Sequence, residues 1–325
     1  MTIIYVSEPI HPQVLEDMAS SAEVLLGFGP QAVQYEDVAD QVDAVMLRSE
    51  RFPSSRIEAS PKLKVIARHG AGIDTVDVAS AQQRGIAVTY CPGGNANAVA
   101  EQVFALVLSL GRKVVRAHTE LTEGPWPKAK QHLVGQELLG QIIGIVGFGE
   151  IGKIVCRIAH GFGMDVLVSD PFLKPDVAVE NRATLVGLNE LLARAGIVSL
   201  HAPLTSSTKH MINAHSLARM RPDALLVNTA RSGLVDEHAL VEALDKACIA
   251  GAALDVIDAE QSGGSVVTFG GRALSNIKNL LVTPHIAGQT NQSLLNVGST
   301  AWNDIQAVLA RREPRYLVAK SFALP

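Results

Sequence analysis

The stretch Ile142–Asp170, IIGIVGFGEIGKIVCRIAHGFGMDVLVSD, determines what the rest of the chain must be. An apolar run leads into three glycines, Gly147, Gly149 and Gly152, spaced G-x-G-x-x-G. An amphipathic segment and a second apolar run follow, and the second run ends at Asp170. This order predicts a strand, a tight glycine turn, a helix and a parallel strand, which is the beginning of a dinucleotide-binding sheet.

Each part of the motif has a physical role in holding a dinucleotide. The first glycine permits the tight turn, the second lets a pyrophosphate approach the backbone, and the third lets the helix pack close to the strand. The helix N-terminus offers unpaired N–H groups to the phosphates. Asp170 can accept hydrogen bonds from an adenosine ribose and would repel a 2′-phosphate, so NAD is favoured over NADP. The predicted cofactor contacts here are Gly147, Phe148, Gly149, Glu150, Ile151, Gly152 and Asp170.

Two other interpretations of the stretch fit it less well. Gly147 to Lys153 also fits the P-loop pattern, but a P-loop continues with Ser or Thr for magnesium, whereas Ile154 follows here. A glycine turn that binds nothing would not need an acidic residue at the end of the next strand. The combination of strand, helix and acid favours the dinucleotide site.

Short apolar runs alternate with helical patterns on both sides of this stretch, which predicts an α/β protein with two doubly wound parallel-sheet domains. We expect a discontinuous flavodoxin-like domain, residues 1–97 and 289–325, and a Rossmann domain, residues 98–288, with a cleft between them. One long helix is expected at Ala98–Leu121, and a last helix at Gln289–Arg312 that returns to the first domain. The predicted strands are Ile3–Val6, Val24–Leu26, Ala44–Leu47, Leu63–Ala67, Ile86–Thr89, Ile142–Val146, Val166–Val168, Ile197–Leu200, Ala224–Val227, Ala250–Leu254 and Leu280–Thr283.

Composition narrows the class of protein. The 325 residues are 47% hydrophobic and 18% charged, with a formal net charge of −4, which disfavours a surface that coats nucleic acid. Three widely spaced cysteines indicate neither a disulfide framework nor a zinc site, and no metal is expected. The beginning of the sequence shows no signal-peptide pattern and no apolar run is long enough for a membrane span, so a cytoplasmic protein is expected.

The chemistry should lie at the carboxyl ends of the strands, where open parallel sheets bind their ligands. Hydride transfer to a 2-oxo acid needs a cation for the substrate and a proton donor suited to neutral pH. Three segments end in suitable residues: LLVNTARSG at Arg231, GAALDVIDAE at Asp255 and Glu260, and LLVTPHIAG at His285. Each residue alone could be an ordinary surface charge or a capping group, but together they favour a catalytic site.

With these residues in place, the chain resembles the D-isomer-specific 2-hydroxyacid dehydrogenases over essentially its whole length. The resemblance rests on several motifs in the family's order. These motifs are RHGAGIDTVD, GGNANAVAEQ, GQELLG, the glycine motif, HAPLTSSTKHMI, VNTARSGLVDE, GAALDV and TPHIAG.

The resemblance implies a catalytic trio of Arg231, Glu260 and His285. His285 would exchange the proton with the substrate, Glu260 would stabilise its imidazolium form, and Arg231 would hold the carboxylate. Asp255 would lie by the nicotinamide carboxamide. The substrate contacts implied in the first domain are Arg48 and the backbone of His69, Gly70, Ala71 and Gly72. The further cofactor contacts implied are His201, Pro203, Thr208, Thr229, Ala230, Arg231, Asp255, His285 and Gly288.

Two departures from the family pattern affect these expectations. Gln261 stands where the family has proline after the catalytic glutamate, and the segment from there to His285 is glycine-rich, so these departures bear on the expected contact between Glu260 and His285. The chain also ends near Pro325 without the regulatory domain that some relatives carry, so feedback inhibition of that kind is not expected.

Several functional alternatives stay open at this point. The leading substrate pair is 3-phosphoglycerate and phosphohydroxypyruvate, with Arg48, Arg51 and Arg68 as candidate partners of a phosphate or sulfonate. Hydroxypyruvate, glyoxylate or sulfolactate would fit the same frame. A different class, an NAD(H)-sensing binding protein, would bind NADH without turnover. The resemblance also implies a homodimer through the region of the long helix, and hinge motion at about Asn97 and Gly288.

Overall fold

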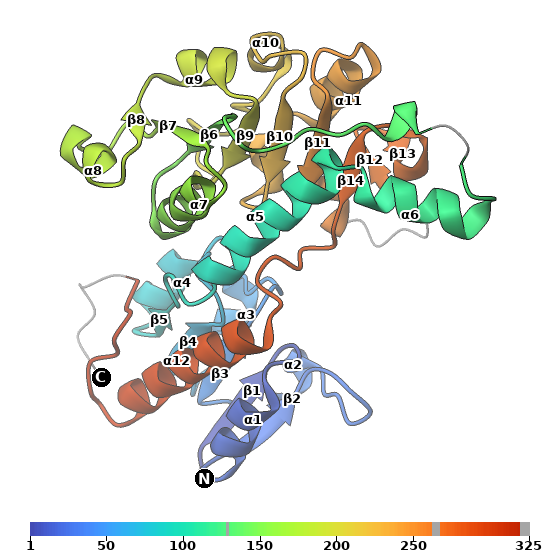
Figure 1. Ribbon diagram of the computed structural model, residues 1–325. Helices are drawn as coiled ribbons and strands as arrows, with labels where there is room; N and C mark the ends of the chain where they lie inside the picture. Colours follow the sequence, from blue (N-terminus) through green and yellow to red (C-terminus); the bar gives the residue numbers. More distant parts are fainter. Residues whose placement is uncertain (128–129, 262–266, 319–325) are drawn as a thin grey trace. The chain divides into compact units, whose positions relative to one another are not determined.

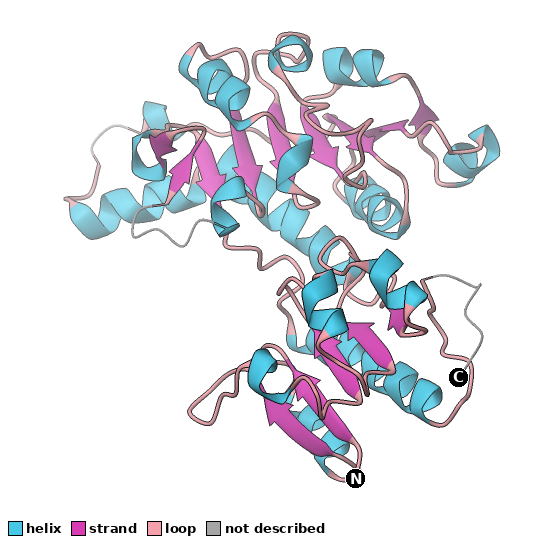
Figure 2. Ribbon diagram, turned by 180° about the vertical axis from the view of Figure 1, so that it is seen from behind, coloured by secondary structure: helices cyan, strands magenta, loops and turns pink. Residues whose placement is uncertain are grey.

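The computed structural model describes residues 1–127, 130–261 and 267–318, except for the side chains of Glu260 and Gln261. The chain forms two compact units, Met1–Asn95 with Gly288–Pro325, and Ala96–Ala287. Each unit contains its own parallel sheet with helices on both faces, as Figures 1 and 2 show. The chain crosses between the units at Asn95–Ala96 and at Ala287–Gly288, and hinge motion at these crossings stays a prediction.

The first unit has a five-stranded sheet in the order β2-β1-β3-β4-β5, which is the flavodoxin-like order. Helices α1 and α12 cover one face and α2, α3 and α4 the other, as the two hydrophobic clusters show. The strands are β1 (Ile3–Val6), β2 (Glu23–Leu26), β3 (Ala44–Leu47), β4 (Val65–Arg68) and β5 (Ala87–Thr89). The helices are α1 (Pro12–Ala19), α2 (Tyr35–Val38), α3 (Ser54–Glu58), α4 (Val78–Gln83) and α12 (Asn291–Leu309).

The second unit has a seven-stranded sheet in the order β14-β11-β10-β9-β6-β7-β8, which is the Rossmann order with one further strand. The further strand is β14. The edge strand β8 was not predicted because its two residues are too short to show a pattern. The strands are β6 (Ile142–Val146), β7 (Asp165–Ser169), β8 (Thr184–Leu185), β9 (Ile197–Leu200), β10 (Leu225–Asn228), β11 (Gly251–Leu254) and β14 (Leu280–Val282). A separate antiparallel pair is formed by β12 (Thr268–Phe269) and β13 (Arg272–Ala273).

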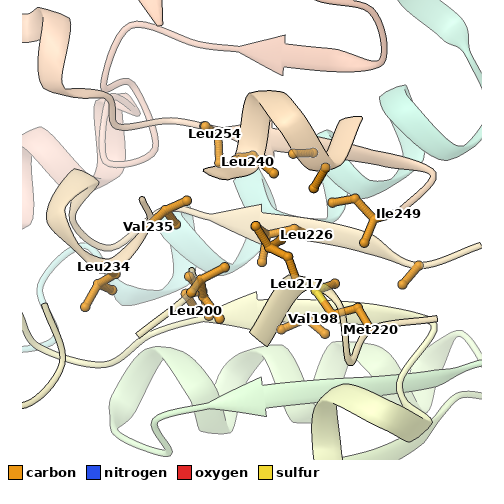
Figure 3. Close-up of a cluster of buried hydrophobic side chains, with 14 of the residues drawn as sticks. Val198, Leu200, Leu217, Met220, Leu226, Leu234, Val235, Leu240, Ile249 and Leu254 are labelled. Atoms are coloured by element: carbon orange, nitrogen blue, oxygen red, sulfur yellow. The ribbon is translucent and has the colours of Figure 1, made fainter. Parts of the chain in front are cut away.

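Alternate residues of the buried strands point to opposite faces of the second sheet, as expected for strands covered on both sides. Leu226 packs with α9, α10 and α11, whereas Leu225 and Val227 pack with α5 and α7. Figure 3 shows the first of these clusters, with Val198, Leu200 and Leu226 close to Leu217 and Leu240. The helices are α5 (Ala96–Gly111), α6 (Val114–Glu123), α7 (Glu150–Gly161), α8 (Pro175–Glu180), α9 (Leu188–Arg194), α10 (Ala214–Leu217) and α11 (Glu237–Asp245), with 3-10 turns η1 (Gln131–Leu133), η2 (Ser232–Leu234), η3 (Asp258–Gln261) and η4 (Leu274–Asn276).

The prediction of one helix over Ala98–Leu121 is wrong. Helix α5 ends at Gly111 and α6 begins at Val114. Lys113 lies between them with φ 55°, in the left-handed region that interrupts a right-handed helix. A Cβ on Gly135 would lie 2.5 Å from the carbonyl oxygen of Gly111, so the arm after α6 returns against the break. The apolar periodicity runs through this break, which is why the sequence does not reveal it.

Candidate active site

The carboxyl ends of six neighbouring strands in the second sheet carry the predicted site residues. Because β14, β11, β10, β9, β6 and β7 are parallel and consecutive in the sheet, their carboxyl ends share one edge. The order of connection reverses between β9 and β6, which is where open α/β sheets bind their ligands. The residues that follow these strands are, in the same order, His285, Asp255 with Glu260, Arg231, His201, the glycine motif and Asp170.

The three motif glycines have three different surroundings. Gly147 has φ 91°, and a Cβ there would lie 2.8 Å from the backbone nitrogen of Ala202. A Cβ on Gly152 would lie 2.5 Å from the carbonyl oxygen of Gly147, so α7 approaches the turn as closely as a glycine permits. A Cβ on Gly149 would meet no atom within 4 Å. The open position is therefore the one where a pyrophosphate would approach the backbone.

The start of α7 and the end of β7 fit the phosphate and ribose parts of a dinucleotide. Gly149 caps α7 without a side-chain hydrogen bond, which leaves the first N–H groups of the helix to a ligand. The carboxylate of Asp170 accepts the N–H of Phe148 at 2.9 Å and that of Phe172 at 2.9 Å. These bonds fix the carboxylate beside the glycine turn. Among the other predicted contacts in this stretch, the Phe148 side chain is buried in the core and Glu150 pairs with Lys153 at 3.7 Å.

Asp255 organises the turn that carries His285. Its buried carboxylate accepts a hydrogen bond from the Thr283 hydroxyl and from the N–H groups of Ile286 at 2.9 Å and Ala287 at 2.8 Å. The N–H of His285 donates to the carbonyl of Asp255 at 2.8 Å, and His285 is exposed with φ 52°. A strained backbone at a candidate catalytic residue is typical of functional sites. Asp255 thus fixes the His285 turn, a role that the sequence did not suggest.

The segment with Arg231 is shaped by a buried asparagine. The amide of Asn228 donates to the carbonyl of Arg231 at 2.8 Å and accepts the N–H of Ala230 at 3.0 Å. Thr229 is buried between them, and the guanidinium of Arg231 donates to the carbonyl of Ala230 at 2.7 Å. This bond orients Arg231, whose guanidinium carries five N–H donors in all. The sequence missed Asn228 because a buried asparagine at a strand end has no pattern of its own.

The third member of the predicted trio is described only in part. The backbone of Glu260 lies in η3, which follows β11, whereas its side chain lies outside the described residues. Its predicted contact with His285 stays a prediction.

His201 differs from His285 although both follow strands of the same sheet. The Nε2 of His201 lies 2.8 Å from the hydroxyl of Ser199, which is fully buried, and its Nδ1 is inaccessible to solvent. Burial lowers the pKa of His201 to about 4. The ring is therefore neutral at physiological pH and packs below the edge of the sheet. Nearby, the predicted contact Thr208 donates its hydroxyl to the carbonyl of Pro203 at 2.6 Å, which closes that loop on itself.

The sheet of the first unit presents a different set of groups at its carboxyl edge. The N–H of His69 donates to Leu47 O at 2.8 Å and that of Gly70 donates to Arg68 O at 2.8 Å. The backbone of His69, Gly70, Ala71 and Gly72 was predicted to contact the substrate. Because the first two N–H groups are bound within the protein, this prediction now concerns the N–H groups of Ala71 and Gly72. The ring of His69 is buried, and burial together with the nearby Arg48 and Arg68 lowers its pKa to about 4.

Two residues that the sequence did not single out fix the segment after β3. The hydroxyl of Ser7 accepts the N–H of Arg48 at 3.1 Å. The carboxylate of Glu8 accepts the N–H groups of Ser49 and, at 3.2 Å, Glu50. The guanidinium of Arg48 donates to the carbonyl of Pro9. The backbone around Arg48 is therefore held from the end of β1, the strand next to β3.

Other groups in the chain could suggest a different chemistry. Cys91 is buried, and burial raises the pKa of its thiol to about 12, so the thiol stays protonated and is a poor nucleophile. Within the described ranges, no group of three or more His, Cys, Asp or Glu side chains is arranged to hold a metal ion. Among the described helices, none has both the length and the apolar character of a membrane span.

Comparison with known proteins agrees with this geometry. Residues 104–287 match the family model described as "D-isomer specific 2-hydroxyacid dehydrogenase, NAD binding domain". A D-3-phosphoglycerate dehydrogenase from Synechocystis is 35% identical over 310 residues, which cover 95% of this chain and 54% of that protein. The chain thus spans about half the length of that relative. A hydroxypyruvate reductase from Thermotoga maritima is 39% identical over 264 residues, which cover 80% of this chain and 83% of the relative.

A solved structure shares the fold along the whole chain. The TT0316 protein from Thermus thermophilus is similar with a TM-score of 0.88 and 33% identity, over 98% of this chain and 100% of that one. The chain belongs to the D-isomer-specific 2-hydroxyacid dehydrogenases, a family of NAD-dependent oxidoreductases, and its seven-stranded unit is the NAD-binding domain.

Proposed function

We propose that this protein interconverts a D-2-hydroxy acid and its 2-oxo acid with NAD as the cofactor. The observation that carries the proposal is the edge of the seven-stranded sheet. There the open Gly149, the Asp170 carboxylate, Arg231 and the His285 turn follow strands that lie side by side. The membership of the family supports the same activity.

The residues of the chain divide the chemistry among them. The bound NAD would supply or accept the hydride at the carbon that bears the substrate oxygen. His285 donates the proton to that oxygen in the reductive direction and removes it in the oxidative direction. Arg231 binds the substrate carboxylate through its planar fork and polarises the carbonyl. Glu260 stabilises the imidazolium form of His285. Asp255 keeps His285 in place through the turn that it holds.

The charge at the end of β7 supports NAD rather than NADP. Asp170 is fixed by two backbone N–H groups beside the glycine turn. A carboxylate in this position accepts hydrogen bonds from the ribose diol and repels a 2′-phosphate.

For the substrate, we favour phosphohydroxypyruvate and 3-phosphoglycerate. Arg48 lies at the carboxyl edge of the first sheet, and one of its N–H groups donates to Pro9, which leaves a fork capable of binding an anion. Hydroxypyruvate is the second candidate, because the carboxylate of Glu8 lies along the same segment and would oppose a distal phosphate. The two relatives described above carry the names of enzymes for these two substrates.

The test is the initial rate of NADH oxidation with phosphohydroxypyruvate, hydroxypyruvate, glyoxylate, pyruvate and sulfopyruvate, with NADPH in parallel. The proposal predicts turnover with NADH and a clear preference for one acid. Tight NADH binding without turnover of any acid would contradict the proposal and favour the NAD(H)-sensing alternative.

We also propose that the protein is a homodimer. Helix α6 has no buried residue in the described chain, and Val114, Val115 and Leu121 are exposed on it, with Trp126 exposed in the arm that follows. An apolar helix face of this kind is typical of an interface. Light scattering should give twice the chain mass, and Val115→Asp should shift the protein toward the monomer. A wild-type monomer at micromolar concentration would contradict this proposal.

A further inference from the structure

The carboxylate of Glu237 joins two segments that are far apart in the sequence. Glu237 is the first residue of α11, and one carboxylate oxygen accepts the N–H of Asp258 at 2.8 Å. The other oxygen accepts the N–H of Gly270 at 3.1 Å. Asp258 is the first residue of η3, and Gly270 lies in the turn between β12 and β13. One side chain therefore fastens both η3 and the hairpin to the same helix.

The hairpin is pressed closely against the start of α11. Gly270 and Gly271 have φ 52° and 76°, as a tight two-residue hairpin turn requires. A Cβ on Gly270 would lie 2.7 Å from the backbone oxygen of Glu237, so another residue could not occupy this position without a shift of the backbone. Phe269, the residue before, is buried in the core with Leu240 and Val241 of α11. The hairpin is thus a fixed support on one side of Glu237.

The ionised form of Glu237 is the form that accepts both of these hydrogen bonds. Burial raises the pKa of the carboxyl, and the two N–H donors oppose that rise because they bind the ionised form. Glu237 lines a small surface pocket. The other titratable residues that line this pocket are His210, Asp236, His238 and Asp258. A carboxylate offers acceptors on both oxygens, whereas an amide of the same shape offers an acceptor on one side only.

The geometry points to Glu237 as a positioning residue that holds the backbone of η3 in place for Glu260. This inference rests on the proposed function, in which Glu260 stabilises the imidazolium of His285. Glu260 lies two residues after Asp258, whose N–H is bound by Glu237. An error of about 1 Å in the placement of a catalytic group is enough to lower a rate by about 100-fold, so a fixed η3 has a direct effect on catalysis.

The test compares Glu237→Gln, Glu260→Gln and the double variant, with Glu242→Gln as the matched control. Glu242 is on the same helix and is paired with Lys246 at the surface, away from η3. The inference predicts that Glu237→Gln lowers kcat by about 10-fold and leaves the Kd of NADH within about two-fold. Glu242→Gln should behave like the wild type. When Glu260 is already glutamine, adding Glu237→Gln should change kcat no further, because both act through one group.

The pH profile distinguishes positioning from general stability. In the reductive direction the reacting form of the enzyme carries the proton on His285, and the proposed role of Glu260 is to favour that form. The alkaline limb of kcat should therefore move to lower pH in Glu237→Gln, and hydrogen exchange at Asp258 and Gly270 should become faster. A lowered melting temperature with an unchanged pH profile and kcat would overturn the inference, as would additive losses in the double variant.

Failure of the proposed function would look different. If Glu260→Gln were as active as the wild type, Glu260 would have no catalytic role and the proposed mechanism would be wrong. If Glu260→Gln lost activity while Glu237→Gln kept it, the mechanism would stand and only the role of Glu237 would be overturned.

Discussion

The two sheets of this protein share one architecture, and a carboxylate fixes the functional edge of each, but the groups that the two edges present are different. In the five-stranded sheet, Ser7 and Glu8 fix the backbone after β3 through N–H groups, and the groups presented there are Arg48 and the backbone of Ala71 and Gly72. In the seven-stranded sheet, Asp255 fixes the turn of His285, a titratable group that faces solvent. The first edge is suited to binding an anion, and the second to transferring a proton.

A carboxylate that accepts backbone N–H groups can therefore serve binding or catalysis, depending on which segment of the chain it fixes. Acidic residues at strand ends accept neighbouring N–H groups in both units, which makes each edge rigid. We expect a substitution that loosens the edge of the five-stranded sheet to raise KM, and one that loosens the edge of the seven-stranded sheet to lower kcat.

The largest difference is expected between Asp255→Asn and Glu8→Ala. Asp255→Asn places an amide where N–H donors approach both oxygens, so the His285 turn should loosen and kcat should fall by about 100-fold. Glu8→Ala removes the oxygen that accepts the N–H groups of Ser49 and Glu50, so it should instead raise the KM of the oxo acid with a smaller effect on kcat. Steady-state kinetics with NADH and the preferred acid measures both. Equal effects of the two substitutions on kcat would break the comparison.

The next effect concerns the glycine turn of the second sheet. Gly152→Ala places a Cβ 2.5 Å from the carbonyl oxygen of Gly147, so α7 must shift, and overpacking of this kind costs about 1–3 kcal/mol. We expect the Kd of NADH to rise by at least about 10-fold, as measured by fluorescence titration. Gly161→Ala is the control, because it ends the same helix and its Cβ would meet nothing within 4 Å. Similar NADH affinities for both variants would contradict the packing argument.

A smaller effect is expected on the choice of cofactor. Asp170→Ala removes the carboxylate that repels a 2′-phosphate, so the ratio of kcat/KM for NADH over NADPH should fall by about 10-fold. Much of the fall in this ratio should come from a lower kcat/KM for NADH, since Asp170 also fixes the N–H of Phe148. Asp176→Ala is a control, because Asp176 is exposed on α8 after the same strand. An unchanged ratio would show that the carboxylate does not select the cofactor.

The smallest expected effect is a loss of stability at acidic pH, to which one histidine in each unit contributes. His69 in the first unit is buried, and the partly buried His201 in the second has an Nδ1 that solvent does not reach. Burial lowers the pKa of each to about 4. The unfolded chain therefore binds protons at these residues at higher pH than the folded chain does. Stability is lost as pH falls from about 6.5 to about 4, at about 1 kcal/mol per pH unit for each histidine.

Urea unfolding at several pH values measures this slope. His69→Gln and His201→Gln should each make it shallower below about pH 6.5, the ordinary pKa of histidine. His118→Gln, which changes an exposed histidine on α6, should leave it unchanged. An unaltered slope in both buried variants would mean that neither ring stays neutral in the folded state.

Much of the fold follows from local sequence pattern. Strands such as β1, β3 and β6 are buried apolar runs that end where the pattern ends, so the predicted bounds Ile3–Val6, Ala44–Leu47 and Ile142–Val146 agree with the structure. The pairs of residues in β8, β12 and β13 are too short to produce a pattern. The break at Lys113 depends on the return of the arm around Gly135, which periodicity does not record.

The candidate site likewise contains residues that could be predicted from the sequence and residues that could not. Arg231, His285 and Asp170 could be predicted because parallel strands bring their carboxyl ends to one edge, so the end of each strand is informative. Glu8, Asn228 and Glu237 could not, because their role is to accept or donate hydrogen bonds with backbone groups from other segments. Only the fold shows which backbone groups come near them.

The most direct test of the account compares two histidines that follow strands of the same sheet. His285→Gln and His201→Gln would be assayed for NADH oxidation with the preferred 2-oxo acid and for NADH binding. We expect His285→Gln to lose about 100-fold or more in kcat with NADH binding retained, whereas His201→Gln should keep kcat within about 10-fold. Near-normal turnover in His285→Gln would contradict the central claim that this edge transfers the proton.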